Sequence, residues 1–328
     1  MWPRISTRSA VGDALGGWPP PVLDPAGPYA DPLAMLSWVL FAIAALVLLV
    51  VVAALWVALF GSARRKGRLG GTRAIWIGGV AFPAVVLSAL LVWGLSLTGS
   101  LTAPIRGDEM RVKVTGEMWW WRIAYLGRDG QAVLHDANEL HIPVGQPVVL
   151  ELESADVIHS FWVPRLSGKL DMIPGRTNMM RIQADEPGVF GGQCAEYCGG
   201  PHALMGFVVV AHEPEDFARL MAARTAGARP PLPAHPDLAR GAQLFQTAGC
   251  AACHRIAGTG ANGIAGPDLS FLGTRQTLGA GILPNNRGTL MGWIGNSQAI
   301  KPGNRMPPYS MLSSDDLRAL AVYLEAQR

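Results

Sequence analysis

The segment Cys194-Ala-Glu-Tyr-Cys-Gly-Gly-Pro-His-Ala-Leu-Met205 carries five potential metal ligands within twelve residues. A sixth, His159, lies thirty-five residues before Cys194. Thiolates select copper(I), zinc or iron–sulfur clusters, imidazole suits copper and zinc, and a weak thioether ligand is typical of copper sites that transfer electrons. Two thiolates four residues apart can bridge two copper ions. The alternative is a zinc site, or a disulfide beside unrelated His and Met residues, and we interpret the segment as a copper site.

Two long apolar segments predict a membrane anchor. Residues 36–60 and 74–97 contain no charged residue, and each is at least as long as the roughly 20 residues that cross about 30 Å of hydrocarbon. A buried helical hairpin of a soluble protein is the alternative. The connecting segment is basic and has no acidic residue, which predicts that it is cytoplasmic and that both termini are outside. Its cations are Arg64, Arg65, Lys66, Arg68 and Arg73.

After the anchor, the hydrophobic pattern changes to short alternating runs separated by Gly, Pro, Asp and Asn. Examples are Met110–Val114, Val148–Glu153 and Phe207–Val210. Alternation over short runs with turn residues between them is typical of strands. About 100 residues of this kind suit a Greek-key β-sandwich.

Residues from about 30 to 212 resemble subunit II of cytochrome c oxidase. The resemblance rests on the Cys194–Met205 segment and on three others, Trp119–Trp121, Asp156–Pro164 and Lys169–Asn178. It implies a cupredoxin fold and a binuclear copper centre, CuA, in which both thiolates bridge the two ions. The implied copper ligands are His159, Cys194, the backbone carbonyl of Glu196, Cys198, His202 and Met205.

The same resemblance implies roles for two further groups. Trp119, the first aromatic residue of its cluster, would be the exposed residue through which electrons enter, while Trp120 or Trp121 packs in the core. The carboxylate of Glu196 would bind a magnesium ion at the interface with subunit I, because Mg²⁺ prefers oxygen ligands.

The C-terminal region carries a second motif, Cys250-Ala-Ala-Cys253-His254. Cys-x-x-Cys-His is the attachment sequence of a c-type haem, and the alternative is a redox-active dithiol. The remaining iron ligand of such a haem is usually Met, which raises the reduction potential. We predict Met306 rather than Met291 or Met311, since the Met-Pro segment around Met306 resembles that of class I cytochromes c. All four cysteines lie in the two motifs, so we expect no structural disulfide.

Together these patterns predict a multidomain fold with five parts. They are an outer N-terminal segment (1–34), a two-helix transmembrane hairpin with a basic cytoplasmic loop (35–98), a cupredoxin-like Greek-key β-sandwich (99–221), a proline-rich linker (222–236) and a small all-α cytochrome c domain (237–328).

The two outer domains carry opposite formal charges. Residues 101–212 contain nine Lys and Arg against thirteen Asp and Glu, whereas residues 237–328 contain eight against five. Opposite charges draw domains together in a manner that salt weakens. We therefore expect the haem domain to visit the surface around Trp119 without docking rigidly.

The resemblance implies an electron-transfer subunit of a haem–copper terminal oxidase in a bacterial cell membrane. Electrons would pass from cytochrome c or another small redox donor through haem c and CuA to subunit I, where oxygen is reduced to water. Subunit III and the lipid bilayer are further expected partners, and nucleic acid is not. The alternatives are a component of nitric oxide or nitrous oxide reductase, and a stand-alone membrane-anchored electron carrier.

Overall fold

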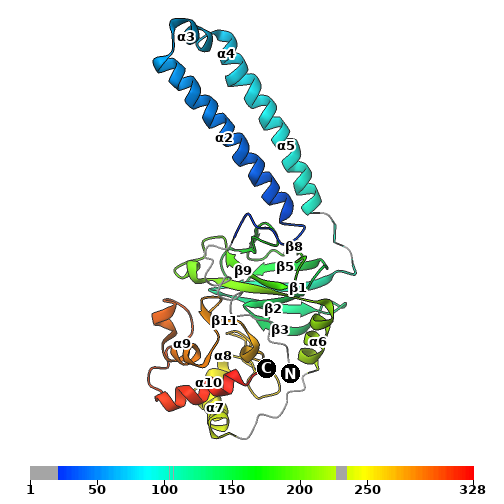
Figure 1. Ribbon diagram of the computed structural model, residues 1–328. Coiled ribbons are helices and arrows are strands. Elements are labelled where there is room, and N and C mark those ends of the chain that lie inside the picture. The colour runs from blue at the N-terminus through cyan, green and yellow to red at the C-terminus, as the bar shows by residue number, and fades with distance from the viewer. Residues whose placement is uncertain (1–20, 103, 106, 227–234) are drawn as a thin grey trace. The chain divides into compact units, whose positions relative to one another are not determined.

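The computed structural model describes residues 21–102, 104–105, 107–226 and 235–328, and Figure 1 shows their elements. These residues form two compact units, one of residues 31–105 and one that combines the chain before and after it. We describe each unit by itself. The predicted N-terminal segment falls largely outside the described residues.

The first unit is a helical hairpin. Its two 30-residue apolar stretches, Asp31–Phe60 and Thr72–Leu101, are long and apolar enough to cross a membrane. Pro83 lies in the first turn of the last helix, directly after a π-helical turn (Ile77–Ala81), and such local changes in backbone hydrogen bonding let membrane-spanning helices tolerate proline. The elements are α2 (Asp31–Phe60), α3 (Ala63–Leu69), α4 (Thr72–Trp76), the π-helical turn η1 (Ile77–Ala81) and α5 (Phe82–Leu101).

The second unit begins with a sandwich of two five-stranded sheets, ordered β3-β2-β1-β5-β8 and β4-β10-β9-β6-β7. The pairs β1/β5 and β10/β4 are parallel and the other pairs are antiparallel. The strands are β1 (Met110–Glu117), β2 (Trp120–Leu126), β3 (Ala132–Ala137), β4 (Glu139–Pro143), β5 (Val148–Ser154), β6 (His159–Trp162), β7 (Leu170–Met172), β8 (Asn178–Ile182), β9 (Gly188–Cys194) and β10 (Gly206–His212). A short 3₁₀ turn, η2 (His202–Leu204), precedes β10.

An aromatic cluster fills the core of the sandwich below the metal-binding segment. Trp121 is 1% exposed, and its ring centroid lies 5.9 Å from that of Phe161 and 4.8 Å from that of Phe207. Gly192 permits this packing, because a Cβ at that position would lie 2.3 Å from the Phe207 ring. Of the two tryptophans considered for the core, Trp121 is therefore the core residue.

The same unit continues through α6 (Pro214–Thr225) into a helical domain. Helix α7 crosses α10 so closely that a Cβ on Gly241 would lie 2.2 Å from the carbonyl oxygen of Ala319. Ser313 caps α10, since its side chain accepts a hydrogen bond from the backbone N–H of Asp316. The elements are α7 (Pro236–Thr247), α8 (Cys250–Cys253), η3 (Leu272–Thr274), β11 (Thr277–Leu278), β12 (Leu283–Pro284), α9 (Arg287–Ile300) and α10 (Ser314–Glu325).

Candidate functional site

The six groups predicted to bind copper converge at one end of the second sheet. Cys194 ends β9 and His159 begins β6, and the pairing of β6 with β9 brings them together. The Nδ1 atom of His159 lies 3.8 Å from the Sγ atom of Cys194, and the carbonyl oxygen of Glu196 lies 3.2 Å from the same sulfur. Around the Sγ atom of Cys198, the Nδ1 atom of His202 lies at 3.5 Å and the Sδ atom of Met205 at 3.8 Å. Each of the two sulfur atoms thus has one imidazole and one weaker donor beside it.

Both cysteines of this cluster are free and buried. Their Sγ atoms lie 3.7 Å apart, far beyond the length of about 2.05 Å of a disulfide bond. The hydrogen bond between the two sulfur atoms lowers the pKa of Cys194 and raises that of Cys198, so the pair readily loses its first proton from Cys194. The thiolate is the form that binds metals, so the donor set suits soft ions held by two sulfur atoms.

A second layer of contacts orients His159. Its Nε2 atom lies 2.8 Å from Oδ1 of Asp156, a carboxylate that can only accept, so Nδ1 is left free toward the sulfur. Gly116 lies against the ring, where a Cβ would come within 2.8 Å of Cδ2. Neutral imidazole with a carboxylate partner is the usual state of a metal-binding histidine, and the residues present therefore fit a copper centre.

Trp119 lies directly beside this cluster. Its indole N–H donates a hydrogen bond of 2.8 Å to the carbonyl oxygen of Cys198. Gly199, with a φ of +111°, lies under the ring, and a Cβ there would come within 3.0 Å of it. The residue is half-buried rather than fully exposed, and its role in electron entry stays a prediction.

The helical domain contains a cavity of about 320 Å³ lined by Cys250, Cys253, His254 and Met306. The Nδ1 atom of His254 lies 2.8 Å from the carbonyl oxygen of Pro267, which can only accept, so Nε2 is left free. Gly266 packs on the imidazole, where a Cβ would lie 2.7 Å from Cε1. The rest of the lining is mainly apolar, which suits a porphyrin ring.

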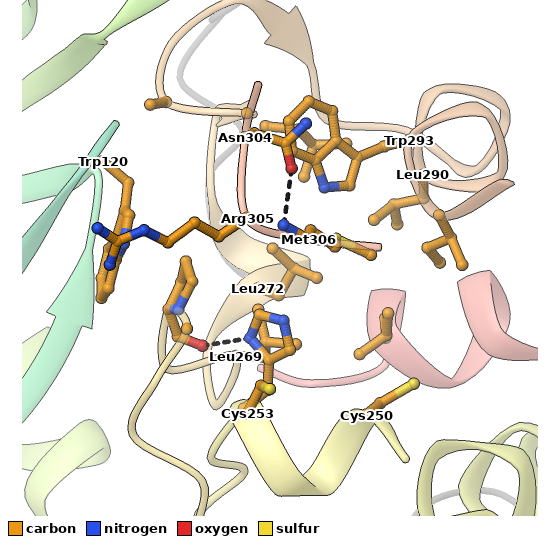
Figure 2. Close-up of a pocket in the computed structure, with 18 of the residues that line it drawn as sticks. Trp120, Cys250, Cys253, Leu269, Leu272, Leu290, Trp293, Asn304, Arg305 and Met306 are labelled. Atoms are coloured by element: carbon orange, nitrogen blue, oxygen red, sulfur yellow. Dashed lines mark hydrogen bonds between the residues drawn. The ribbon is translucent and has the colours of Figure 1, made fainter. Parts of the chain in front are cut away.

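Among the three candidate methionines, Met306 is the one that lines the cavity, whereas Met311 is 76% exposed. Asn304 fixes its position, because Oδ1 of Asn304 accepts a hydrogen bond of 2.9 Å from the backbone N–H of Met306. Figure 2 shows this bond, with Met306 on one side of the cavity and Cys250 and Cys253 on the other. The residues present therefore fit a covalently attached haem.

Comparison with known proteins agrees with both sites. Residues 125–212 match the family described as cytochrome c oxidase subunit II, periplasmic domain, and residues 238–327 match cytochrome c. The chain is 37% identical to cytochrome c oxidase subunit 2 of Alkalihalophilus pseudofirmus over 93% of its length and 90% of the relative. The chain belongs to the cytochrome c oxidase subunit II family. The protein of the same name from Bacillus subtilis is 32% identical over 66% of this chain and 62% of its own length.

Membership of the subunit II family establishes the general expectations. The chain is part of a haem–copper terminal oxidase, and its two domains imply CuA copper and haem c. The two apolar helices anchor a periplasmic domain to the membrane. The predicted multidomain fold of hairpin, cupredoxin-like sandwich and helical cytochrome c domain is confirmed. The assignment of individual ligands stays a prediction.

In this subunit II the sandwich forms part of the lining of the haem cavity, a feature that the sequence did not reveal. Trp119, Trp120 and Asn138 of the sandwich line the cavity together with residues of the helical domain. Trp119, which the sequence predicted to lie on an exposed surface, thus faces the helical domain. The two domains form one compact unit, and the expectation that the haem domain visits this surface without docking rigidly stays a prediction.

Buried charges hold this interface together. Asp136 of β3 is 1% exposed and accepts hydrogen bonds from Arg224 at 2.6 Å and from Arg275 of the helical domain at 2.7 Å. Lys301 is 2% exposed and donates to the carbonyl oxygens of Trp119 and Leu204. Neither Asp136 nor Lys301 belongs to a recognisable motif, so only the folded chain identifies them.

The carboxylate of Glu196 lies on a polar surface of the sandwich. The Nζ atom of Lys169 lies 3.5 Å from this carboxylate and 3.5 Å from that of Asp171. The three side chains are about half exposed. The ammonium group of Lys169 neutralises part of the charge of these two carboxylates, and magnesium binding by Glu196 stays a prediction.

Proposed function

We propose that this subunit passes electrons from an external donor through haem c and CuA to subunit I, where oxygen is reduced to water. The observation that carries the proposal is the position of Trp119. One side of this residue lines the cavity that suits the haem, and its indole N–H bonds to the Cys198 carbonyl within the copper cluster. A single residue therefore connects the two sites.

Each site residue has a distinct proposed role. The thiols of Cys250 and Cys253 would form thioether bonds to the haem, and His254 and Met306 would bind its iron. Bound copper and haem would supply reversible one-electron chemistry. Asp156 and Asn304 would hold His159 and Met306 in place, and the closed sandwich surface would exclude water. The proposed copper ligands are His159, Cys194, Glu196 through its carbonyl, Cys198, His202 and Met205.

The orientation in the membrane is also proposed. Residues on both sides of the hairpin belong to the same unit: the N–H of Ala26 donates to the carbonyl of Arg165 in the sandwich at 2.7 Å. Both flanks of the anchor would therefore lie on the periplasmic side, with the basic residues of α3 in the cytoplasm. Subunit III and a cytochrome c or other small redox donor complete the proposed partners, with magnesium at Glu196 against subunit I.

Metal analysis and electron paramagnetic resonance of the purified full-length chain, matured with haem and copper, test the proposed function. We expect two copper ions and one iron per chain, with one unpaired electron shared by both copper ions in the oxidised form. Rapid reduction of the haem should then be followed by reduction of the copper centre. A single-copper spectrum, or zinc in place of copper, would contradict the proposal.

Replacing Met306 with alanine is expected to leave the haem covalently attached and to lower its reduction potential. Cys250 and Cys253 still form both thioether bonds, whereas the iron loses the ligand that raises its potential. The measurement is a redox titration together with the sulfur-to-iron absorption band. Met311→Ala is the matched control, because Met311 is 76% exposed and its loss should change neither quantity. If the Met306 variant retained the wild-type potential and the absorption band, Met306 would not be the iron ligand.

A further inference from the structure

A buried lysine joins the two domains at the point where they meet. Lys301 follows α9, and its side chain reaches out of the helical domain. Its ammonium group donates to the carbonyl oxygens of Trp119 at 2.6 Å and Leu204 at 2.8 Å in the sandwich, and of Gly279 at 3.0 Å in its own domain. An ammonium group has three N–H donors. All three are used here.

The cost of burying this charge indicates a role beyond packing. All three acceptors are neutral carbonyls, and the residue is only 2% exposed. Burial lowers the pKa of Lys301 to about 7, an effect that the nearby Cys198 opposes. Three neutral carbonyls offset the desolvation penalty of a buried ammonium only in part, and an apolar side chain of similar length would fill the same space without that penalty.

On the copper side, both acceptors belong to segments that touch the cluster. Trp119 accepts from Lys301 through its backbone and donates through its indole to Cys198. Leu204 immediately precedes the proposed ligand Met205, whose carbonyl oxygen accepts from the backbone N–H of Cys194. The ammonium group therefore holds in place two segments of the sandwich that contact the copper cluster.

On the haem side, Lys301 is bonded to the loop that carries the proposed iron ligand. The Nδ2 atom of Asn304 donates to the carbonyl oxygen of Lys301 at 2.7 Å, and Oδ1 of Asn304 accepts from the N–H of Met306. Figure 2 shows Asn304 above Met306 in this arrangement. A continuous set of hydrogen bonds thus runs from Met306 through Asn304 and Lys301 to the copper loop.

We propose that Lys301 is a positioning residue for electron transfer from haem c to the copper centre. It holds Trp119 and the Leu204–Met205 segment at a fixed separation from the Met306 loop. Electron tunnelling weakens exponentially with separation, so a small displacement of these segments slows transfer. The inference rests on the proposed function, because it presupposes that haem and copper bind where the two clusters lie.

The test uses the assembled oxidase and the variant Lys301→Met, which keeps the length of the side chain and removes all three donors. After flash photoreduction of the haem, its reoxidation and the reduction of the copper centre are followed by absorbance. We expect the rate to fall severalfold, because tunnelling slows as Trp119 and the Leu204–Met205 segment move away from the Met306 loop. The haem and copper reduction potentials, and the rate at which a small reductant reduces the haem, should not change.

Two further variants make the result decisive. Arg318→Met removes one charge from the helical domain at a half-exposed position, and its transfer rate should stay within about twofold of the wild type. Lys301→Gln keeps a shorter donor and should give an intermediate rate.

A wild-type rate in Lys301→Met, or loss of haem or copper from both Lys301 variants, would overturn the positioning role. Absence of transfer in the wild-type oxidase would instead refute the proposed function itself.

Discussion

Replacing Cys198 with serine is expected to eliminate the two-copper state and to reduce oxygen consumption driven by an external donor at least about a hundredfold. Its Sγ atom lies 3.7 Å from that of Cys194, 3.5 Å from Nδ1 of His202 and 3.8 Å from Sδ of Met205. The serine hydroxyl is a hard, weakly acidic ligand that cannot bridge two copper ions as a thiolate does. Copper content, electron paramagnetic resonance and oxygen uptake are the measurements.

Tyr197→Phe is the matched control for this variant. Tyr197 is next to Cys198 in the sequence but is 74% exposed, so the change should leave two copper ions and normal oxygen uptake. The covalent haem should persist in both variants, since Cys250 and Cys253 are untouched. An unchanged copper count and spectrum in Cys198→Ser would contradict a binuclear centre bridged by two thiolates.

The parts of this protein that could be predicted from sequence are those encoded within short segments. Five of the six copper donors lie in one twelve-residue stretch, and the haem attachment motif occupies five consecutive residues. Chain connectivity alone keeps such groups close together. The membrane helices were predictable for a similar reason, because length and apolar composition are sufficient to define them.

Contacts between distant parts of the chain were not predictable in this way. Lys301 and Trp119 are separated by 182 positions, and Asp136 and Arg275 by 139. No periodicity or motif relates them, since they meet only after the helical domain has packed on the sandwich. The partial burial of Trp119 was not predicted for the same reason, because each domain was considered without the other.

The net charges of the two domains could not identify their contacts for a related reason. Counting formal charges treats them as solvated and screened, which favours a loose and salt-dependent encounter. In the structure, Asp136 and Arg275 are almost completely buried at the interface, where water and salt screen them little. The contact between the two domains depends on where a few charged side chains lie, and the net charge of each domain does not contain this information.

Replacing Asp136 with alanine is accordingly expected to cost about 3–5 kcal/mol, because it leaves two buried guanidinium groups without their anion. Arg224 and Arg275 both donate to this carboxylate, and all three side chains are at most 4% exposed. Burial by itself raises the pKa of Asp136, but Arg275 and Arg224 outweigh it and hold the pKa below its ordinary value. The stabilising effect of this carboxylate is therefore fully present above the ordinary pKa of an aspartate and is lost only as the pH falls through the lowered pKa of the folded protein.

Thermal unfolding of the full-length protein, followed at the haem absorption band, measures this cost. We expect the midpoint to fall by about 10 °C or more in Asp136→Ala, and haem-to-copper transfer to slow as the interface loosens. Asp185→Ala is the matched control, since Asp185 lies on the exposed surface of the same domain and its removal should change stability by no more than about 0.5 kcal/mol. Because the three charges span both domains, equal midpoints in the two variants would show that the interface does not depend on the Asp136 cluster.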